Sequence, residues 1–289
     1  MAKTILITGA NGQLGNEMRN LLSANEEFSP IFTDVQELDI TSREAIDAFF
    51  AQHPIHYVVN CAAYTAVDNA EDNAALCERL NADAVQYLAE AAKRHGAKMV
   101  QVSTDYVFDG CAHRPYREDD ATAPCSVYGT TKLDGEQRLL GIMPTDAIIF
   151  RTAWLYSPYG KNFVKTMLTL GRTKDALKVI FDQVGTPTYA KDLAIAIITA
   201  IKAPQWHAGI YHFSDEGAIS WYDFTKAIHR IAGISGCEVS PCTTAEYPTK
   251  ARRPHYSVLD KSKYKSTFQA TVPYWADSLA ECITRIENQ

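Results

Sequence analysis

The sequence predicts an α/β fold built on a doubly wound parallel sheet, and two observations carry this prediction. Short apolar runs alternate with amphipathic stretches through the first half of the chain. The first run, at residues 4–8, is rich in β-branched residues and is followed at once by glycines. Uninterrupted apolar runs of this length suit parallel strands that are buried on both faces, with crossover helices between them.

The elements are expected in the following order. Strands are predicted at 3–8, 30–33, 56–61, 97–103 and 146–151, with helices at about 12–23, 42–52, 71–95 and 126–141. Further helices are predicted at 162–174, 220–234 and 272–287, and a returning strand at 210–213. The stretch 189–203 carries apolar residues at 190, 193, 194, 197, 198 and 201, a helical stripe that we expect to pack in the core.

Three glycines follow the first predicted strand in the spacing Gly9-x-x-Gly12-x-x-Gly15. Glycines here permit a tight turn and bring a pyrophosphate close to the helix N-terminus, where free N–H groups and the helix dipole favour anions. The spacing differs from the commoner Gly-x-Gly-x-x-Gly, but the strand before it and the helix after it are the required context. The sequence therefore predicts a Rossmann-like dinucleotide site formed by Gly9, Asn11, Gly12, Gln13, Leu14 and Gly15.

Ligands of such sheets bind beyond the carboxyl ends of the strands, so the residues after each run are the next candidates. Asp34 follows the second run and can accept hydrogen bonds from an adenosine ribose while repelling a 2′-phosphate, which favours NADH over NADPH. A solvated turn residue is the alternative interpretation of Asp34. The other candidates for cofactor contacts are Asp39 and Ile40 beside the adenine, then Ala62, Ala63, Tyr64 and Thr65 after the third run, and Ser103 after the fourth.

Tyr128 and Lys132 lie four residues apart in a predicted helix and therefore share one face. A phenol is a reluctant acid at neutral pH, and a nearby cation stabilises its anion and lowers its pKa. The spacing thus predicts a poised proton donor, with an ordinary pair on the surface of a helix as the alternative.

Composition limits the function classes. The 289 residues carry a net charge of −6, with 46% hydrophobic residues and no basic run, so neither nucleic acid nor a membrane surface is an expected partner. The longest apolar run, 193–201, is too short to cross a bilayer, and no secretory leader is expected before the first strand. The seven cysteines are scattered and are expected to be reduced, in a cytoplasmic protein. No catalytic metal is expected, because the eight histidines show no paired ligand spacing.

Together these motifs resemble the extended short-chain dehydrogenase/reductases and, within them, the dTDP-4-dehydrorhamnose reductase family. The resemblance covers essentially the whole chain. It rests on the segments 7–15, 60–68, 103–110, 128–132, 151–156, 182–188 and 251–260. It implies a dinucleotide-binding domain over 1–153, to which the chain returns at about 187–213, and a smaller C-terminal substrate-binding region over 154–289. A homodimer is also compatible with the family.

The resemblance implies that hydride passes from NADH or NADPH to C4 of a nucleotide-linked 4-keto-6-deoxy sugar, converting dTDP-4-dehydro-β-L-rhamnose to dTDP-L-rhamnose. Tyr128 is then the general acid, Lys132 holds the nicotinamide ribose and stabilises the tyrosinate, and Thr104 hydrogen-bonds the carbonyl oxygen. Substrate contacts are expected from Thr104, Asp105, Trp154, Asn162, Gln183, Arg252 and Arg253. Trp154 could instead be a core residue, and the two arginines could be surface charges.

Three other functions of the same superfamily are considered. A sugar-nucleotide dehydratase has an Asp-Glu pair after the catalytic threonine, whereas Asp105 here is followed by Tyr106, so dehydration is disfavoured. A 4-epimerase retains bound NAD and consumes no NADH. A non-catalytic regulatory subunit uses the fold only for binding, which the intact Thr104, Tyr128 and Lys132 argue against.

Overall fold

A six-stranded parallel sheet forms the centre of the molecule, whose computed structural model describes residues 2–288. In spatial order its strands are β10 (Gly209–His212), β5 (Ala147–Thr152), β4 (Lys98–Thr104), β3 (Tyr57–Asn60), β1 (Lys3–Thr8) and β2 (Phe28–Phe32). The chain moves outward from β1 to β2 and then crosses to β3 on the other side of β1. The six predicted strands of this sheet are confirmed, with bounds that differ by at most two residues. The reversal between β1 and β3 creates a crevice at their carboxyl ends.

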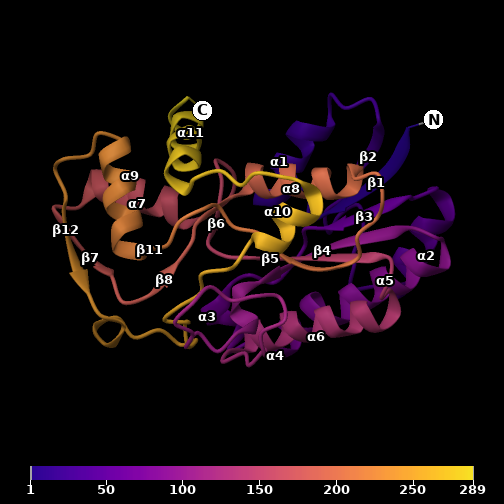
Figure 1. Ribbon diagram of the computed structural model, residues 1–289, viewed down its shortest axis with the longest axis horizontal. Coiled ribbons are helices and arrows are strands. Elements are labelled where there is room, and N and C mark those ends of the chain that lie inside the picture. Colours follow the sequence, from indigo (N-terminus) through magenta and orange to yellow (C-terminus); the bar gives the residue numbers. More distant parts are fainter. Residues whose placement is uncertain (1, 289) are drawn as a thin grey trace.

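Helices cover both faces of the sheet, as the doubly wound fold requires (Figure 1). One face carries α1 (Gln13–Leu22), α8 (Ala190–Lys202) and α10 (Ser262–Phe268), and the other carries α2 (Arg43–Gln52), α5 (Ala84–Arg94) and α6 (Val127–Ile142). The apolar stripe of α8 is buried against β1 and β5, as predicted from its spacing. Tyr264 of α10 packs in the same core beside Phe150 of β5, so the chain returns to the sheet a second time after β10.

The helix predicted at about 71–95 is confirmed over residues 74–94, but it begins three residues later than predicted and contains a π-helical turn. The segment forms α3 (Val67–Ala70), α4 (Ala74–Glu78), a π-helical turn (Arg79–Asp83) and then α5. Asn73 has φ −128° and ψ 42°, outside the helical region, and this interrupts the path before α4. The π-helical turn admits one extra residue per turn, a feature that often marks functional sites.

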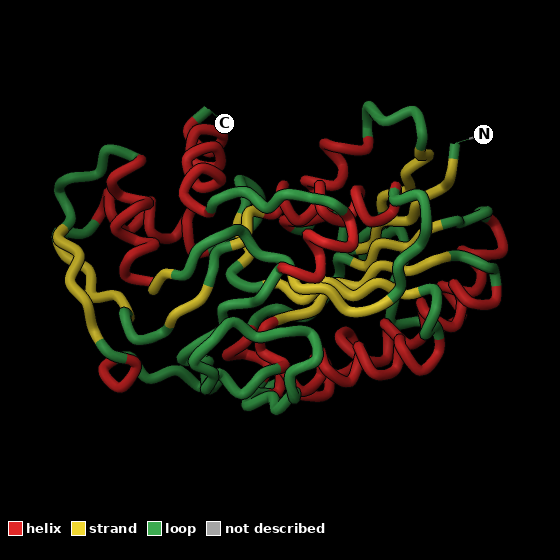
Figure 2. Tube along the Cα trace, viewed as in Figure 1, coloured by secondary structure: helices red, strands yellow, loops and turns green. Residues whose placement is uncertain are grey.

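The C-terminal region contributes a smaller lobe beside the carboxyl ends of the strands, at the left of Figure 1. It contains α7 (Phe163–Thr173), α9 (Trp221–Ile231) and α11 (Trp275–Glu287), with β7 (Ala176–Ile180) paired to β12 (Glu238–Cys242). Two-residue strands complete it: β6 (Leu155–Tyr156), β8 (Val184–Gly185), β9 (Thr188–Tyr189) and β11 (Ile219–Ser220). Figure 2 shows that mostly loops join this lobe to the sheet.

The ends of two predicted helices of this lobe need correction. The helix α9 ends three residues before the predicted limit, because Gly233 takes φ 66° and Ile234 donates its N–H back to His229 O at 2.9 Å. The helix α11 begins after Pro273 rather than at residue 272.

The two lobes are tied together by a buried carboxylate. Glu17 of α1 is 1% exposed and accepts hydrogen bonds from Arg285 of α11 at 2.9 and 3.1 Å. Arg285 also donates to the hydroxyl of Tyr189.

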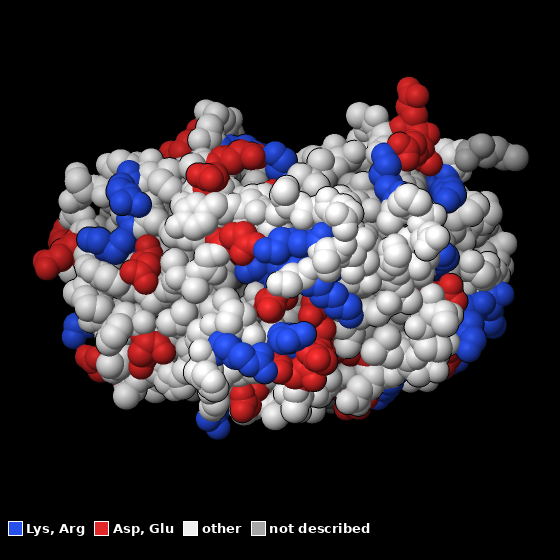
Figure 3. Space-filling model, in the orientation of Figure 1, with Lys and Arg blue, Asp and Glu red and all other residues white. Residues whose placement is uncertain are grey.

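On the face drawn in Figure 3, basic and acidic side chains are interspersed. Within residues 2–288, no helix combines the length and apolarity that a bilayer crossing needs.

Candidate active site

A cavity of about 700 Å³ lies at the carboxyl ends of the strands, and both lobes contribute to its wall. Eighteen of the predicted site residues line it: Gly9, Gly12, Gln13, Leu14, Asp34, Asp39, Ile40, Ala62, Ala63, Thr65, Ser103, Thr104, Asp105, Tyr128, Lys132, Trp154, Asn162 and Arg253. The sheet brings together residues that are as much as 244 positions apart in the sequence, from Gly9 to Arg253. This is the arrangement expected when ligands bind at a topological switch point.

The glycine turn has the shape that a dinucleotide pyrophosphate needs. Gly9 has φ 62°, and a Cβ there would lie 2.7 Å from the backbone of Ala62. Gly15 lies directly against Gly9 and Ala10, so a side chain at this position would prevent α1 from packing on the turn. Gly12 is the N-cap of α1 and supplies no side-chain cap, which leaves the first N–H groups of the helix available to an anion.

The carboxylate of Asp34 lines the part of the cavity beside the glycine turn. Its oxygens accept hydrogen bonds from the backbone N–H of Asn11 at 3.1 Å and of Val35 at 2.8 Å. Asp39 accepts from the hydroxyl and N–H of Thr41, and these hydrogen bonds lower the pKa of its carboxyl group. Both carboxylates face the cavity, so this end of the site is acidic.

The loop after β3 is positioned by a buried amide. Asn81, in the π-helical turn, accepts from the N–H of Tyr64 at 2.9 Å and donates to its carbonyl oxygen at 3.1 Å. The same amide reaches Thr131 of α6 at 3.3 Å. The π-helical turn thereby fixes the loop that carries Ala62, Ala63 and Thr65, and it also places Leu80 in the cavity wall.

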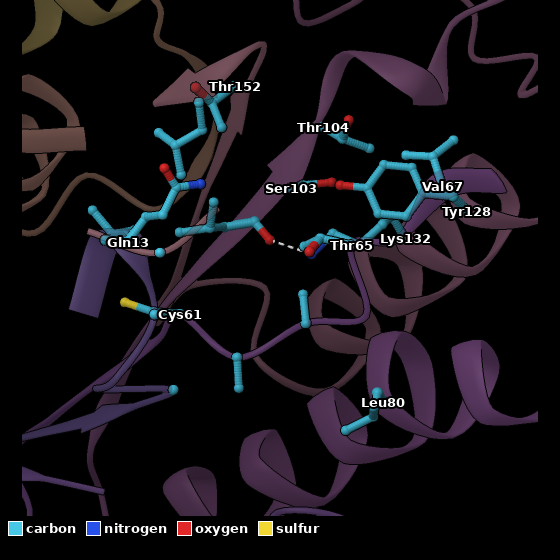
Figure 4. Close-up of a pocket in the computed structure, with 18 of the residues that line it drawn as sticks. Gln13, Cys61, Thr65, Val67, Leu80, Ser103, Thr104, Tyr128, Lys132 and Thr152 are labelled. Carbon is cyan, nitrogen blue, oxygen red and sulfur yellow. Dashed lines mark hydrogen bonds between the residues drawn. The ribbon is translucent and has the colours of Figure 1, made fainter. Parts of the chain in front are cut away.

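Tyr128 and Lys132 share one face of α6, as their spacing predicts, and both line the cavity. Ser126 caps the helix by accepting from the N–H of Gly129 at 3.1 Å. The buried ammonium group of Lys132 donates to the carbonyl oxygen of Val102 at 2.6 Å. Figure 4 shows both side chains directed toward the end of β4, where Ser103 and Thr104 lie.

The expectation that Lys132 makes Tyr128 more acidic is wrong for the protein without ligands. Burial raises the pKa of Tyr128 above its ordinary value, and the hydroxyl of Thr104 offsets this only in part. Burial also lowers the pKa of Lys132 to about 8. The reason is that both groups are removed from solvent, which disfavours their charged forms, and that the ammonium group is bound to the neutral carbonyl of Val102. Tyr128 therefore keeps its proton at neutral pH.

The end of β4 carries a short chain of hydroxyl and carboxyl groups. Thr104 donates to Asp105 Oδ1 at 2.9 Å and accepts from the N–H of Tyr106 at 3.2 Å. Burial raises the pKa of Asp105 to about 6. The hydroxyl of Ser103 is buried without a hydrogen-bond partner among the described residues. An unpaired hydroxyl in the cavity wall suits a site that completes its hydrogen bonds with a ligand.

The wall nearest the small lobe contains Trp154, Asn162 and Arg253. Trp154 follows β5 and has φ 48°, a conformation that non-glycine residues rarely adopt. Asn162 caps α7 and donates to Gln13 Oε1 at 3.0 Å, which joins the small lobe to the glycine turn. The guanidinium group of Arg253 donates to Asp68 Oδ2 at 2.6 Å and to the hydroxyl of Tyr106 at 3.2 Å.

Five predicted site residues do not line the cavity: Asn11, Gly15, Tyr64, Gln183 and Arg252. The buried amide of Gln183 donates instead to Thr244 Oγ1 at 3.1 Å, within the small lobe. Arg252 is exposed and lines a separate small hollow with Arg253 and Cys125.

Thirteen lining residues are absent from the prediction: Val35, Leu38, Cys61, Val67, Leu80, Val102, Tyr106, Thr152, Ala153, Leu155, Gly160, Lys161 and Trp221. Most of them are sequence neighbours of predicted residues. A prediction that took in more residues around each predicted position would have included them. Leu80 and Trp221 carry no such signal, because a π-helical turn and the packing of the small lobe bring them to the cavity.

Comparisons with known proteins agree with this geometry. Residues 3–288 match the family described as the RmlD substrate binding domain. A dTDP-4-dehydrorhamnose reductase from Aggregatibacter actinomycetemcomitans is 42% identical over 284 residues, covering 95% of this chain and 96% of the relative. The crystal structure of a dTDP-4-dehydrorhamnose reductase from Clostridium acetobutylicum is 46% identical, covers 98% of this chain and 99% of its own, and superposes with a TM-score of 0.94.

A second solved structure bears on the cofactor. The dTDP-4-dehydrorhamnose reductase of Bacillus anthracis, solved in complex with NADP, is 36% identical with a TM-score of 0.95 and covers 99% of this chain and all of its own. Sequence identity at this level over nearly the full length shows membership of the same family, not only a shared fold. The chain therefore belongs to the RmlD substrate-binding family, that of the dTDP-4-dehydrorhamnose reductases.

Proposed function

We propose that this chain is an NAD(P)H-dependent reductase that converts the 4-keto group of a nucleotide-linked 6-deoxy sugar to an alcohol, with dTDP-4-dehydro-β-L-rhamnose as substrate and dTDP-L-rhamnose as product. The observation that carries the proposal is the meeting of Thr104, Tyr128 and Lys132 in one cavity with an uncapped glycine turn. The bound nicotinamide supplies the hydride.

The residues of the chain would handle the proton. Tyr128, which keeps its proton at neutral pH, donates it to the carbonyl oxygen as C4 is reduced. Lys132 stabilises the resulting tyrosinate, because its ammonium group lies on the same face of α6. Thr104 orients the carbonyl oxygen by turning its hydroxyl proton from Asp105 to the substrate.

The two ends of the cavity suit the two ligands. The glycine turn and Asp34 would hold the dinucleotide, and we propose NADH as the preferred form because the carboxylates of Asp34 and Asp39 oppose a 2′-phosphate. Arg253 would meet the sugar-nucleotide diphosphate and Trp154 the deoxyhexose ring. We place the reaction in the cytoplasm, in line with seven free cysteines.

The experiment is NADH oxidation with enzymatically prepared dTDP-4-keto-L-rhamnose, with the product identified by NMR. The wild-type chain should consume one NADH per sugar, and Tyr128→Phe should abolish turnover while NADH affinity stays within about twofold. Retention of stoichiometric NAD with no net NADH consumption would instead support the 4-epimerase. If no dTDP-4-keto-6-deoxyhexose causes NADH oxidation, the result would support the non-catalytic binding function.

A further inference from the structure

The indole of Trp221 lies in the wall of the cavity, although it comes from the small lobe, far along the chain from the strand ends. Trp221 is the first residue of α9, and its place is fixed by the cap before it. Ser220 accepts from the N–H of Asp223 at 3.1 Å, and Asp223 accepts from the N–H of Ser220 at 3.0 Å. This reciprocal capping box holds the start of the helix and directs Trp221 toward the sheet.

Trp221 stacks on Trp154, the residue that follows β5. Their ring centroids are 3.4 Å apart and their planes differ by 11°. Phe163 of α7 lies against Trp221 with ring centroids 4.6 Å apart. Trp154, just after the last residue of β5, and Trp221 of α9 therefore form a single aromatic surface that borders the cavity, and Phe163 of α7 supports it.

Trp154 is constrained from the other directions as well. Its backbone is held at φ 48°, and its carbonyl oxygen accepts from the N–H of Thr188 at 3.2 Å. Gly185 lies so close to the six-membered ring that a Cβ there would be 2.7 Å from Cε2 of Trp154. A side chain that is strained in its backbone, packed against a glycine and stacked on a second indole has one available position.

We propose that Trp221 is a substrate-positioning residue that holds Trp154 in the orientation in which it contacts the 6-deoxyhexose ring. The inference rests on the proposed function, because it assigns the sugar to this end of the cavity. The C5 methyl group and ring C–H groups of a 6-deoxy sugar form an apolar surface, which an aromatic plate favours over water. Without Trp221 the indole of Trp154 loses its stacking partner and the fixed surface is lost.

The test separates substrate binding from chemistry. Trp221→Ala should raise KM for dTDP-4-keto-L-rhamnose about tenfold, the upper range for loss of an aromatic pair, with kcat within about threefold of the wild type. The Kd for NADH should stay within about twofold, since the glycine turn is untouched. Trp221→Phe keeps a ring in the stack and should restore most of the affinity for the sugar nucleotide.

A double-mutant cycle identifies the route of the effect. Because Trp221 acts through Trp154, the Trp154→Ala/Trp221→Ala double variant should bind the sugar no more weakly than Trp154→Ala alone. Additive losses, or a Trp221→Ala variant with unchanged KM, would overturn the proposal. Wild-type activity is measured in parallel, so that failure of the wild type to reduce the sugar refutes the proposed function itself.

Two further variants exclude a general loss of structure. Gly185→Ala leaves both indoles in the chain but places a Cβ against Trp154, and it should reproduce the rise in KM. Trp206 packs against Tyr57 in a tilted arrangement with ring centroids 6.1 Å apart, and it does not line the cavity, so Trp206→Phe should leave KM unchanged. If Trp221→Ala does not fold by circular dichroism, an unchanged KM in Gly185→Ala overturns the proposal.

Discussion

At the cavity, the ammonium group of Lys132 is bound to a carbonyl oxygen of the sheet, that of Val102. This contact holds Lys132 beside Tyr128 in the protein without ligands. Burial disfavours the charged form of the lysine and lowers its pKa. In the proposed function, the ribose hydroxyls of a bound cofactor would be further partners for the same ammonium group. The protein thus positions the lysine first and leaves part of its hydrogen bonding to the ligand.

The pKa of Lys132 predicts the alkaline limit of activity. In the proposed mechanism, the ammonium form of Lys132 stabilises the tyrosinate. Burial lowers the pKa of Lys132 to about 8, so kcat/KM should fall as pH rises above about 8. The profile of kcat/KM for NADH, which reports the enzyme without bound cofactor, is measured between pH 6 and 9.5. A Lys132→Arg variant that retains activity should show no such fall, since guanidinium stays charged. A flat wild-type profile up to pH 9.5 would contradict the assignment.

Asp34 should decide the choice of cofactor. Its charge opposes a 2′-phosphate, so the wild type should use NADH with a higher kcat/KM than NADPH. Asp34→Asn removes the charge and keeps one oxygen, which can accept from the N–H of Asn11, while the hydrogen bond from the N–H of Val35 loses its acceptor. We expect this substitution to raise the NADPH-to-NADH ratio of kcat/KM about tenfold. An equal NADPH-to-NADH ratio of kcat/KM in the wild type and the variant would show that Asp34 does not discriminate between the two cofactors.

Short-range sequence signals predicted some residues of the site and missed others for a physical reason. The i, i+4 spacing was enough to place Tyr128 and Lys132 on one face, because helix geometry is local. Their pKa values depend on burial and on Val102, thirty residues before Lys132, which no local pattern reveals. Gln183 was assigned to the site by resemblance alone, and packing turns it to Thr244.

At the scale of elements, the turn between β1 and α1 shows the closest fit between residue type and geometry. Gly9 takes a left-handed conformation while the backbone of Ala62 passes directly over it. The turn is thereby packed against the loop after β3, and the start of α1 faces the cavity. Sequence predicted this turn because a strand, three glycines and a helix follow one another without interruption.

Substitution of Gly9 should damage the fold as well as cofactor binding. Gly9→Ala adds a methyl group at φ 62° and 2.7 Å from Ala62, so the free energy of unfolding should drop by about 2 kcal/mol or more. Gly141→Ala is the matched control, because this exposed glycine of α6 has nothing within 4 Å of its Cβ position. It should stabilise the protein by about 0.5–1 kcal/mol. Urea unfolding compares the two, and equal stabilities would contradict the steric argument.

The segment between β3 and α5 marks the limit of periodic patterns. The pattern predicted the helix that the structure has at 74–94, but it did not reveal the π-helical turn within it. In that turn, Asn81 forms hydrogen bonds with the backbone of Tyr64 and with Thr131. These contacts lie 17 and 50 residues away along the chain. The amide satisfies partners in two other elements, and the helix accommodates it with a π-helical turn.

For the whole molecule, the contact of Arg285 with Glu17 joins α11 of the small lobe to α1 of the sheet. Glu17 is buried, and Arg285 is the cationic partner of its carboxylate. Because α1 also begins at the glycine turn, the contact fixes the small lobe relative to the cofactor end of the cavity.

Removing this arginine should weaken the whole fold. Arg285→Ala leaves a buried carboxylate without its cationic partner and should lower the free energy of unfolding by roughly 2–3 kcal/mol, since the arginine itself is partly exposed. Arg172→Ala breaks an exposed ion pair between Arg172 of α7 and Glu287 of α11. This substitution should change the free energy of unfolding by less than about 1 kcal/mol. Thermal and urea unfolding measure both variants. Equal effects would mean that burial of Glu17 is not what matters.

The place of β10 in the sheet has a consequence for protein synthesis. This strand pairs with β5 and comes from residues 209–212, while Tyr264 completes the core above them. A nascent chain that has left the ribosome only as far as residue 153 therefore carries β5 as an open, apolar edge. The ribosome must translate 59 further codons, from residue 153 to residue 212, before β10 can cover this edge, and 111 before Tyr264 can complete the core. During that interval chaperones have a defined surface to protect.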